Sequence, residues 1–411
     1  MHTKRTTCRI CDGRRIQRFL TLGPMPLANS FLRSPEEFAA EPSFALDVYY
    51  CQDCTLVQLI DVVDREALFH NCLYVKRLSR TLSARDIEFA RGVVEELRLG
   101  PDDLVVEAGS GDGGLLAAFQ RHGVRTLGVE PATALASMSR EAGMETFDKF
   151  FDEHTATELA QSHGRAKAII AHYVLAHVDD PRGFLRGCRH VLAPAGRVVI
   201  QVAYLRDLVE QLQYDTIYHE HHCYFAATTL VRLCDAVGLR VQNVERIPAQ
   251  GGSLRLWLCG QEERAEHVDS IRALMHEERA AGLTESACYE RFAGEVEQSR
   301  AALVELLNDL QRQGRSIAAY GAPAKGNTLL NYCRIDTKLV AFTVDKNPLK
   351  VGTYTPGMHI PVLPASALRE RRPDYVLLLP WNLADEIIAQ ERDYLAAGGR
   401  FIIPIPMARV V

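Results

Sequence analysis

The amino-acid sequence predicts an α/β protein in three parts: a small cysteine-containing module over residues 1–75, a doubly wound α/β domain over 76–250, and a second, smaller α/β domain over 251–411. Three observations support this prediction. The chain has 411 residues, more than one hydrophobic core usually organises. Two Cys-x-x-Cys pairs occur in its first part. In the rest, apolar β-branched runs alternate with helical stretches, in two successive blocks.

Composition and charge restrict the kinds of partner. Apolar residues make up 47% of the chain, yet no apolar run approaches the roughly 20 residues of a membrane helix, and no secretory signal precedes Cys8. We therefore expect a cytoplasmic protein without a membrane partner. The net charge is −5 and the charges are mixed along the chain, which predicts no nucleic-acid partner but leaves room for a small anion such as a diphosphate. We expect a monomer, because three domains can cover one another's sheet faces.

Four cysteines of the first part, Cys8, Cys11, Cys51 and Cys54, form two Cys-x-x-Cys pairs. Two such pairs supply the four thiolates of a closed tetrahedral zinc site, which predicts a structural metal ion. Four unrelated buried cysteines are the alternative, whereas a redox site does not need a second pair. The odd total of eleven cysteines argues against a disulfide framework.

The second and third parts each carry the pattern of a parallel sheet covered by helices on both faces. A helix is expected over about 78–98, where apolar residues recur at helical spacing before Gly100 and Pro101. Between 262 and 313, an Ala-, Leu- and Glu-rich segment predicts one or two long helices. The apolar runs predict strands at 104–107, 127–130, 168–171, 197–202 and 239–244, and then at 316–320, 339–344, 375–379 and 400–403.

A glycine-rich segment joins the strand at 104–107 to a helix that begins near Leu115. Glycines let the backbone turn tightly against a ligand, and Glu130, which ends the next strand, is placed to bind a ribose diol. NAD and S-adenosylmethionine both suit such a loop. The whole set of residues favours S-adenosylmethionine, with NAD and a fold that binds neither as alternatives. The candidate cofactor contacts are Glu107, Gly109, Gly111, Glu130, Pro131, Phe150, His172 and Ser79.

The segment Tyr218–Tyr224 places three imidazoles, a carboxylate and two phenols within seven residues. Histidine titrates near neutrality, so this cluster could remove a proton from a carbon acid. A metal site is less suited, because the H-E-x-x-H spacing is missing. A hydrogen-bonded polar loop is the remaining alternative. His177 follows an apolar run and is either a core histidine or a second active-site group.

The tail has its own glycine turn between a strand and a helix start, at residues 317–327. Backbone amides and Lys325 could bind a diphosphate there, and a purely structural turn is the alternative. Asp345 ends the next predicted strand, while Trp381 and Asn382 follow a later one. The candidate substrate contacts are Lys325, Gly321, Asn327, Asp345, Trp381 and Asn382.

Taken together, these motifs make the chain resemble, over nearly its whole length, the sugar C-methyltransferases that modify nucleotide-linked keto-deoxysugars in antibiotic pathways. The resemblance is carried by the paired cysteines, the segment Leu22–Asn29, the loop around Gly109 and Gly111, Tyr218–His221, and Gly321–Gly326. It implies a class I methyltransferase Rossmann-like core with an N-terminal zinc-binding module and a second, C-terminal Rossmann-like domain.

The resemblance also implies a chemistry. S-Adenosylmethionine and structural zinc would be the cofactors, and a nucleotide-linked ketosugar the substrate. His221 would remove the proton next to the ketone, and the enolate would take the methyl group. Two departures from the family, Lys76 and His172, leave other acceptors open: an oxygen, a nitrogen or a non-sugar carbon. A scaffold without turnover is the non-enzymatic alternative. By resemblance, the residues near the substrate are His221, Tyr218, Glu220, His177 and Tyr74, which closes over the site.

Overall fold

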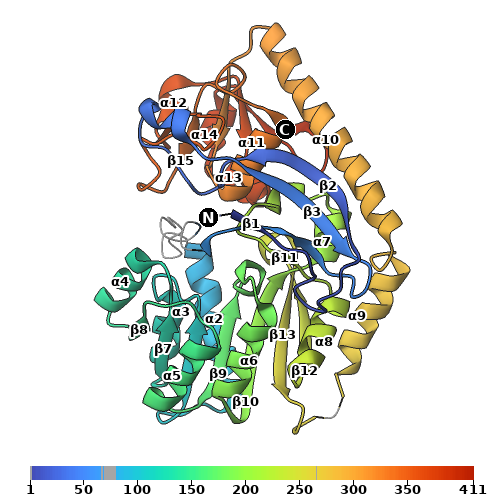
Figure 1. The fold of residues 1–411 in the computed structure, drawn as a ribbon. Helices are drawn as coiled ribbons and strands as arrows, with labels where there is room; N and C mark the ends of the chain where they lie inside the picture. Colours follow the sequence, from blue (N-terminus) through green and yellow to red (C-terminus); the bar gives the residue numbers. More distant parts are fainter. Residues whose placement is uncertain (1, 66–67, 69–79, 265) are drawn as a thin grey trace.

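The computed structural model describes residues 2–65, 68, 80–264 and 266–411, and Figure 1 shows their arrangement. Strands of the N-terminal module lie between a central domain and a tail domain, and the long helix α10 (Ser286–Arg312) runs along one side of the molecule beside them. None of the described helices is long and apolar enough to cross a membrane.

The N-terminal module contains a small antiparallel sheet whose outermost strand comes from a distant part of the chain. The strand order is β11-β4-β3-β2, and β11 (Cys223–Tyr224) belongs to the predicted histidine cluster. The module therefore shares a sheet with that cluster. Its own elements are β1 (His2–Lys4), β2 (Ile16–Met25), the 3-10 helix η1 (Pro35–Ala40), β3 (Phe44–Cys51), β4 (Val57–Leu59) and β5 (Asp61–Val63), which pairs with β1.

The central domain has a seven-stranded sheet in the order β12-β13-β10-β9-β6-β7-β8. All five predicted strands are present. The alternation predicted a parallel sheet, but one strand runs the other way. A short connection containing Gly251 and Gly252 turns β12 back into β13, which is antiparallel to both its neighbours. The sheet therefore extends to Gly260, past residue 250. The strands are β6 (Leu104–Ala108), β7 (Arg125–Val129), β8 (Thr146–Phe147), β9 (Ala166–His172), β10 (Leu192–Ala203), β12 (Leu239–Ile247) and β13 (Ser253–Gly260).

Helices connect these strands and position the loops at their carboxyl ends. Every residue of β6 is buried, as expected for a strand covered on both faces, so its apolar run is continuous. The helical elements are α2 (Arg80–Leu97), α3 (Gly114–Gln120), α4 (Thr133–Glu141), α5 (Glu153–His163), η3 (Leu175–His177), α6 (Pro181–Val191), α7 (Leu205–Glu210), η4 (Tyr214–Thr216), α8 (Ala227–Ala236) and η5 (Ala249–Gly251).

The tail domain follows two helices, α9 (Asp269–Ala280) and α10, as the sequence predicts. Its six-stranded sheet has the order β16-β15-β14-β17-β18-β19 and is parallel except for the last pair. The strand predicted at 339–344 is present as β15, which is shorter and lies at the end of the predicted range. The elements are β14 (Ile317–Tyr320), α11 (Ala324–Cys333), β15 (Thr343–Asp345), β16 (Val362–Pro364), α12 (Ala367–Arg371), β17 (Tyr375–Leu378), η6 (Trp381–Leu383), α13 (Ala384–Gln390), α14 (Arg392–Ala396), β18 (Arg400–Ile403) and β19 (Arg409–Val410).

The module contributes to the cores of both domains. Cys8 and Cys54 pack in the hydrophobic core that also holds the buried strands of the central domain. Leu20 and Leu22 of β2 pack in a second core with one face of α10 and with the tail domain. Because apolar burial is the main stabilising term in folding, the module fixes the two domains relative to each other.

Candidate active site

A cavity of about 2310 Å³ lies between the central and tail domains and is bordered by the module. Predicted site residues from both domains line it, so residues far apart in sequence meet at one place. Tyr74 and Ser79 lie outside the residues that the structure describes. The predicted residues that line the cavity are Gly109, Gly111, Glu130, Pro131, Phe150, His172, His177, Tyr218, Glu220, His221, Gly321, Lys325, Asp345 and Asn382.

The first glycine turn is fixed by Glu130, which is buried at the end of β7. Its two carboxylate oxygens accept hydrogen bonds from the backbone N–H groups of Gly111, at 2.8 Å, and Ala132, at 2.9 Å. Gly109 and Gly111 have φ angles of 69° and 57°, a backbone conformation that residues with side chains rarely adopt. No atom lies within 4 Å of the Cβ position of Gly111, so the turn leaves open space for a ligand there. Glu107 is buried within β6 and does not line the cavity.

The end of β9 holds side chains against the same cavity. The His172 ring packs against Phe89 at a centroid distance of 4.5 Å. Tyr173, which follows, has a φ of 60°, and its N–H donates to the Gln201 carbonyl at 2.7 Å. A strained non-glycine residue at such a position is typical of a functional site. Tyr173 and Gln201 line the cavity but were not predicted from the sequence, because neither belongs to a local motif.

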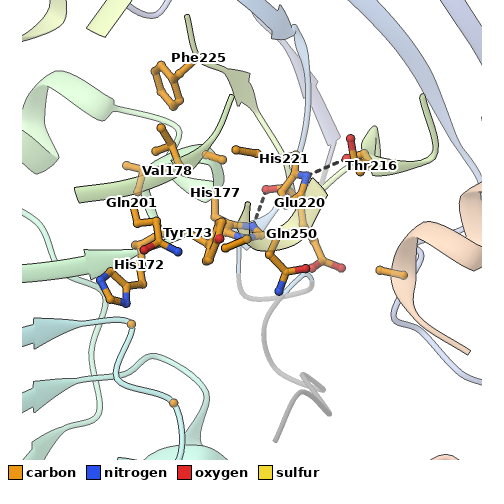
Figure 2. A pocket seen from close by; sticks show the side chains of 18 of the residues that line it. His172, Tyr173, His177, Val178, Gln201, Thr216, Glu220, His221, Phe225 and Gln250 are labelled. Carbon is orange, nitrogen blue, oxygen red and sulfur yellow. Dashed lines mark hydrogen bonds between the residues drawn. The ribbon is translucent and has the colours of Figure 1, made fainter. Parts of the chain in front are cut away.

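Two histidines face this cavity as neutral bases (Figure 2). The Nδ1 atom of His221 lies 2.8 Å from the Thr216 carbonyl, and Nδ1 of His177 lies 2.8 Å from the Glu220 carbonyl. A carbonyl only accepts, so each Nδ1 carries the hydrogen and each Nε2 is the proton acceptor. Burial lowers the pKa of His177 to about 4 and holds the pKa of His221 well below its usual value. Both imidazoles are therefore neutral near pH 7.

Glu220 is buried beside these histidines and is bound by the module. Asn29 donates through Nδ2 to both Glu220 oxygens, at 2.8 and 2.9 Å. Burial raises the pKa of Glu220 to about 7, although the hydrogen bond from Asn29 and the charge of Lys350 oppose the shift. The carboxyl group can therefore act as a proton donor near neutrality. Asn29 lies in a segment that supported the family resemblance, but no local pattern predicted this contact.

The other histidines of the cluster differ in position. His219 points away from the cavity, with its Nε2 3.2 Å from the Phe44 carbonyl, and it packs against the Phe44 ring. His222 is buried at the cavity wall, and its backbone N–H donates to the Ala176 carbonyl at 2.7 Å. Tyr218 packs on His221 at a centroid distance of 4.0 Å. Within the segment Tyr218–Tyr224, His221 is thus the histidine whose ring faces the cavity as a neutral base, with Tyr218 and Glu220 beside it.

The four predicted metal ligands converge. The Sγ atoms of Cys8, Cys11, Cys51 and Cys54 all lie within 4.8 Å of one another. Sulfur ligands about 2.3 Å from a tetrahedral zinc ion lie roughly 3.8 Å apart, so the cluster fits zinc. Both pairs have the same backbone form: the residue after the second cysteine has a positive φ, and its N–H donates to the carbonyl of the first cysteine.

The first cysteine pair also supports the loop that carries His177. Arg9, between Cys8 and Cys11, is fully buried and forms an ion pair with Asp179 at 3.0 Å. In the opposite direction, Arg182 forms an ion pair with Asp12 at 2.8 Å. Removal of Asp179 would leave the charge of the buried Arg9 uncompensated, so this contact holds the loop, whereas the more exposed Arg182–Asp12 pair contributes less. Ion pairs therefore connect the segment that holds the zinc site to the wall of the active-site cavity.

The second glycine turn, in the tail domain, repeats the first with different side chains. Gly321 has a φ of 80°, and the Asp345 oxygens accept from the backbone N–H groups of Ala322, at 2.7 Å, and Asn347, at 2.8 Å. Lys325 lies in the first turn of α11, at the cavity wall. Its ammonium group hydrogen bonds to Asn382 and lies 4.8 Å from the centre of the Trp381 ring.

Two predicted substrate contacts are corrected by the structure. Asn327 is fully buried and donates to the Ala28 carbonyl at 2.7 Å, so it joins the tail domain to the module instead of lining the cavity. Trp381 is also absent from the cavity lining; its Nε1–H donates to Asp215 at 2.6 Å. Asn327 follows the glycine turn at Gly321 and Trp381 follows β17, but each side chain points toward another domain.

Three family models match successive parts of the chain. The model described as "Putative zinc binding domain" matches residues 8–69, "Methyltransferase domain" matches 79–244, and "C-methyltransferase C-terminal domain" matches 248–406.

Individual proteins resemble the chain to different extents. The C-methyltransferase NovU of Streptomyces niveus is 35% identical over 404 residues, which are 98% of this chain and 96% of that protein. The ubiquinone biosynthesis O-methyltransferase of Xylella fastidiosa (strain 9a5c) is 31% identical over 98 residues, 23% of this chain and 40% of that protein. The solved magnesium protoporphyrin IX methyltransferase of Synechocystis PCC 6803 is 13% identical, covers 48% of this chain and 97% of that chain, and has a TM-score of 0.35.

Proposed function

Because the chain belongs to the family of S-adenosylmethionine-dependent C-methyltransferases, we propose that it methylates a carbon next to the ketone of a sugar linked to a nucleoside diphosphate. The observation that carries the proposal is the neutral His221, whose Nδ1–H is held by the Thr216 carbonyl and whose ring faces the cavity that the two glycine turns also line. Methylation at carbon needs such a base, because the C–H proton must leave before the methyl group arrives.

The open space beside Gly111 and the buried Glu130 suit S-adenosylmethionine at the first turn. When bound, it supplies an electrophilic methyl group on a sulfonium sulfur. His221 takes the proton of the acidic C–H bond on Nε2, and the electron pair of that bond passes into an enolate. Glu220, with a pKa of about 7, is placed to donate a hydrogen bond to the developing oxyanion. The donor held at the first turn would supply the methyl group for the new C–C bond at the enolate carbon, with the electron pair of the S–CH3 bond left on sulfur.

The sugar nucleotide is expected to lie toward the tail domain. Lys325 is a half-buried cation at the cavity wall, and charge-assisted hydrogen bonds to phosphate oxygens are strong. We propose that Lys325 and the start of α11 hold the diphosphate, so that the sugar reaches His221 and the donor methyl group. The remaining candidate acceptors are an oxygen, a nitrogen or a non-sugar carbon acid.

Solvent exchange separates these acceptors. A candidate nucleotide ketosugar is incubated with enzyme in heavy water, with S-adenosylhomocysteine in place of the methyl donor, and the sugar is analysed by mass spectrometry. We expect the acidic C–H to exchange, and the complete reaction to add one methylene unit of mass on carbon. Methylation without exchange would contradict carbanion chemistry and favour an oxygen or nitrogen acceptor.

The base is tested with His221→Ala, with His122→Ala as the control, since His122 is exposed and does not line the cavity. Loss of a general base typically costs about 10²- to 10⁴-fold in rate. We expect such a loss of both exchange and methylation in His221→Ala, with calorimetric binding of S-adenosylmethionine retained. Full activity in that variant would remove His221 as the base and leave the methyltransferase assignment intact.

A further inference from the structure

A buried carboxylate, Asp215, lies where the tail domain meets the central domain. Its side chain is fully buried in η4, and the indole Nε1–H of Trp381 donates to its Oδ2 at 2.6 Å. Burial raises the pKa of Asp215 to about 6, and the charge of Lys325 opposes this rise. Because a buried carboxylate needs hydrogen-bond partners, the contact with Trp381 fixes the position of η4 against the tail domain.

The turn that contains Asp215 also holds the base. Thr216 is the next residue, and its carbonyl accepts the Nδ1–H of His221 at 2.8 Å. The turn is rigid around it: the Thr216 hydroxyl donates to the Gln213 carbonyl at 2.8 Å, and the Ile217 N–H donates to the Tyr214 carbonyl at 3.1 Å. Displacement of Asp215 therefore moves the carbonyl that determines which nitrogen of His221 carries the hydrogen.

Besides Asp215, the Trp381 indole has a second charged neighbour, Lys325. The Lys325 ammonium lies 4.8 Å from the centre of the Trp381 ring, and it hydrogen bonds to Asn382, the residue after Trp381. Asp215 stabilises the charged form of Lys325, which burial disfavours. One short chain of contacts thus runs from the cation at the cavity wall through Trp381, Asp215 and Thr216 to the base.

We infer that Asp215 and Trp381 are positioning residues that couple the tail-domain anion site to the tautomer and orientation of His221. The inference rests on the proposed function for the identity of the base, and it gives Trp381 a different role from the substrate contact that the sequence predicted. In this arrangement, the base is fully oriented only when the tail domain is docked on η4. Proton abstraction is thereby linked to the domain that receives the diphosphate.

A kinetic comparison separates the two roles of Trp381. Trp381→Phe removes the N–H donor and keeps an apolar ring, and Tyr375→Phe is a control in the same domain, away from the cavity lining. We expect Trp381→Phe to lower kcat and the exchange rate about tenfold, with KM for the sugar nucleotide changed less than twofold. A several-fold rise in KM at unchanged kcat would make Trp381 a substrate contact, and no change in either would overturn the inference too.

Two variants of Asp215 test whether the hydrogen bond to Trp381 is what matters, because one keeps an acceptor and the other does not. In Asp215→Asn the side-chain oxygen still accepts from the indole, whereas Asp215→Ala has no acceptor. We expect Asp215→Asn to keep most of the activity that Asp215→Ala loses. Equal losses in both would contradict the hydrogen-bond relay. The chain has two tryptophans, so the fluorescence of Trp257 reports folding in Trp381→Phe.

A measurement without substrate keeps this inference separate from the proposed function. In protein labelled with 15N-histidine, the His221 signals are assigned by their absence in His221→Gln. We expect Nδ1 to be protonated and Nε2 unprotonated in the unsubstituted protein, and a mixture of tautomers in Trp381→Phe. An unchanged single tautomer would overturn the coupling, whatever the acceptor proves to be. If the unsubstituted enzyme methylates no sugar nucleotide, the proposed function fails while this result still stands.

Discussion

The two glycine turns of the molecule, around Gly109 and Gly321, have the same backbone plan. In each, the first glycine has a positive φ, and its N–H donates to the carbonyl of a residue in the neighbouring parallel strand: Val129 at 2.8 Å and Val344 at 2.6 Å. An acid next to that residue, Glu130 or Asp345, then accepts hydrogen bonds from the turn. The second α/β domain is thus built on the same local solution as the first.

The side chains of the two turns differ, and the difference predicts different ligands. Beside Gly111 the first turn is open, with no cation at the start of its helix. The tail turn has Pro323 in place of a further glycine and places Lys325 in the first turn of its helix. An open acidic turn suits a cationic donor with a ribose, and a turn with a half-buried lysine suits an anion. We therefore propose that the same backbone plan serves two ligands of opposite charge.

Removal of zinc should produce the largest effect and should act unequally on the two turns. The tail turn is braced by the module through Asn327 and the Ala28 carbonyl, and the base segment through β11. Structural zinc sites contribute on the order of 10 kcal/mol to folding in small zinc domains. After chelation we expect methyl transfer to be lost, with calorimetric binding of S-adenosylmethionine retained. Simultaneous loss of donor binding would show that the first turn also depends on the module.

Gly111→Val should fill the open space of the first turn. The Cβ position meets no protein atom, so the fold should lose only about 1–2 kcal/mol from the positive φ. We expect the Kd for S-adenosylmethionine to rise about a thousandfold, roughly 4 kcal/mol, in calorimetry. Gly123→Val is a matched control, because Gly123 also has a positive φ and open space but lies away from the cavity lining. A comparable rise in the Kd for S-adenosylmethionine in both variants would show that the donor binds elsewhere.

The buried Glu220, between the two turns, should give stability a pH dependence. Its pKa is raised to about 7 in the folded protein, so the folded state keeps this proton where the unfolded state has lost it. The free energy of unfolding should therefore fall as pH rises from about 4.5 to about 7, by at most about 3.5 kcal/mol from this group. Glu220→Gln should lack that decline in urea titrations. The lowered pKa of His177 acts in the opposite direction but is common to both proteins, so it cancels in the difference.

Lys325→Gln should have the smallest of these effects, and of the two glycine turns it should affect only the tail turn. We expect KM for the sugar nucleotide to rise about tenfold, equivalent to roughly 1.4 kcal/mol, because one charge-assisted contact to an anion is lost. The Kd for S-adenosylmethionine should not change. Lys338→Gln, at an exposed lysine of the same domain, is the control. A larger change in donor affinity than in KM would reverse our assignment of the two turns.

Local patterns in the sequence were sufficient for the elements and for the centre of each turn. The continuous apolar run of β6 predicts a strand because both of its faces are buried, and the two Cys-x-x-Cys pairs predict one metal site because their spacing fits four ligands. Glu130 and Asp345 were placed correctly at strand ends, because strand ends meet at one edge of a parallel sheet.

Contacts between distant segments were not predictable in this way. Asn29 and Glu220 are 191 residues apart, and Arg9 and Asp179 are 170 residues apart. Neither pair belongs to a repeat or a local motif, and the partner of each depends on how the module docks on the central domain. The directions of Asn327 and Trp381 were missed for the same reason: the sequence shows that Asn327 follows a glycine turn and Trp381 a strand, but the neighbouring domain determines which way they point.

The pairing of β11 with β4 has a consequence for protein engineering. A recombinant hybrid that takes residues 1–63 from another relative would place a foreign edge beside Cys223 and Tyr224, next to the base. Register between the exchanged piece and this native strand would then govern whether His221 still meets its carbonyl partner. Productive crossovers should transfer both strands together, so that the inherited unit is discontinuous along the gene although it is continuous in space.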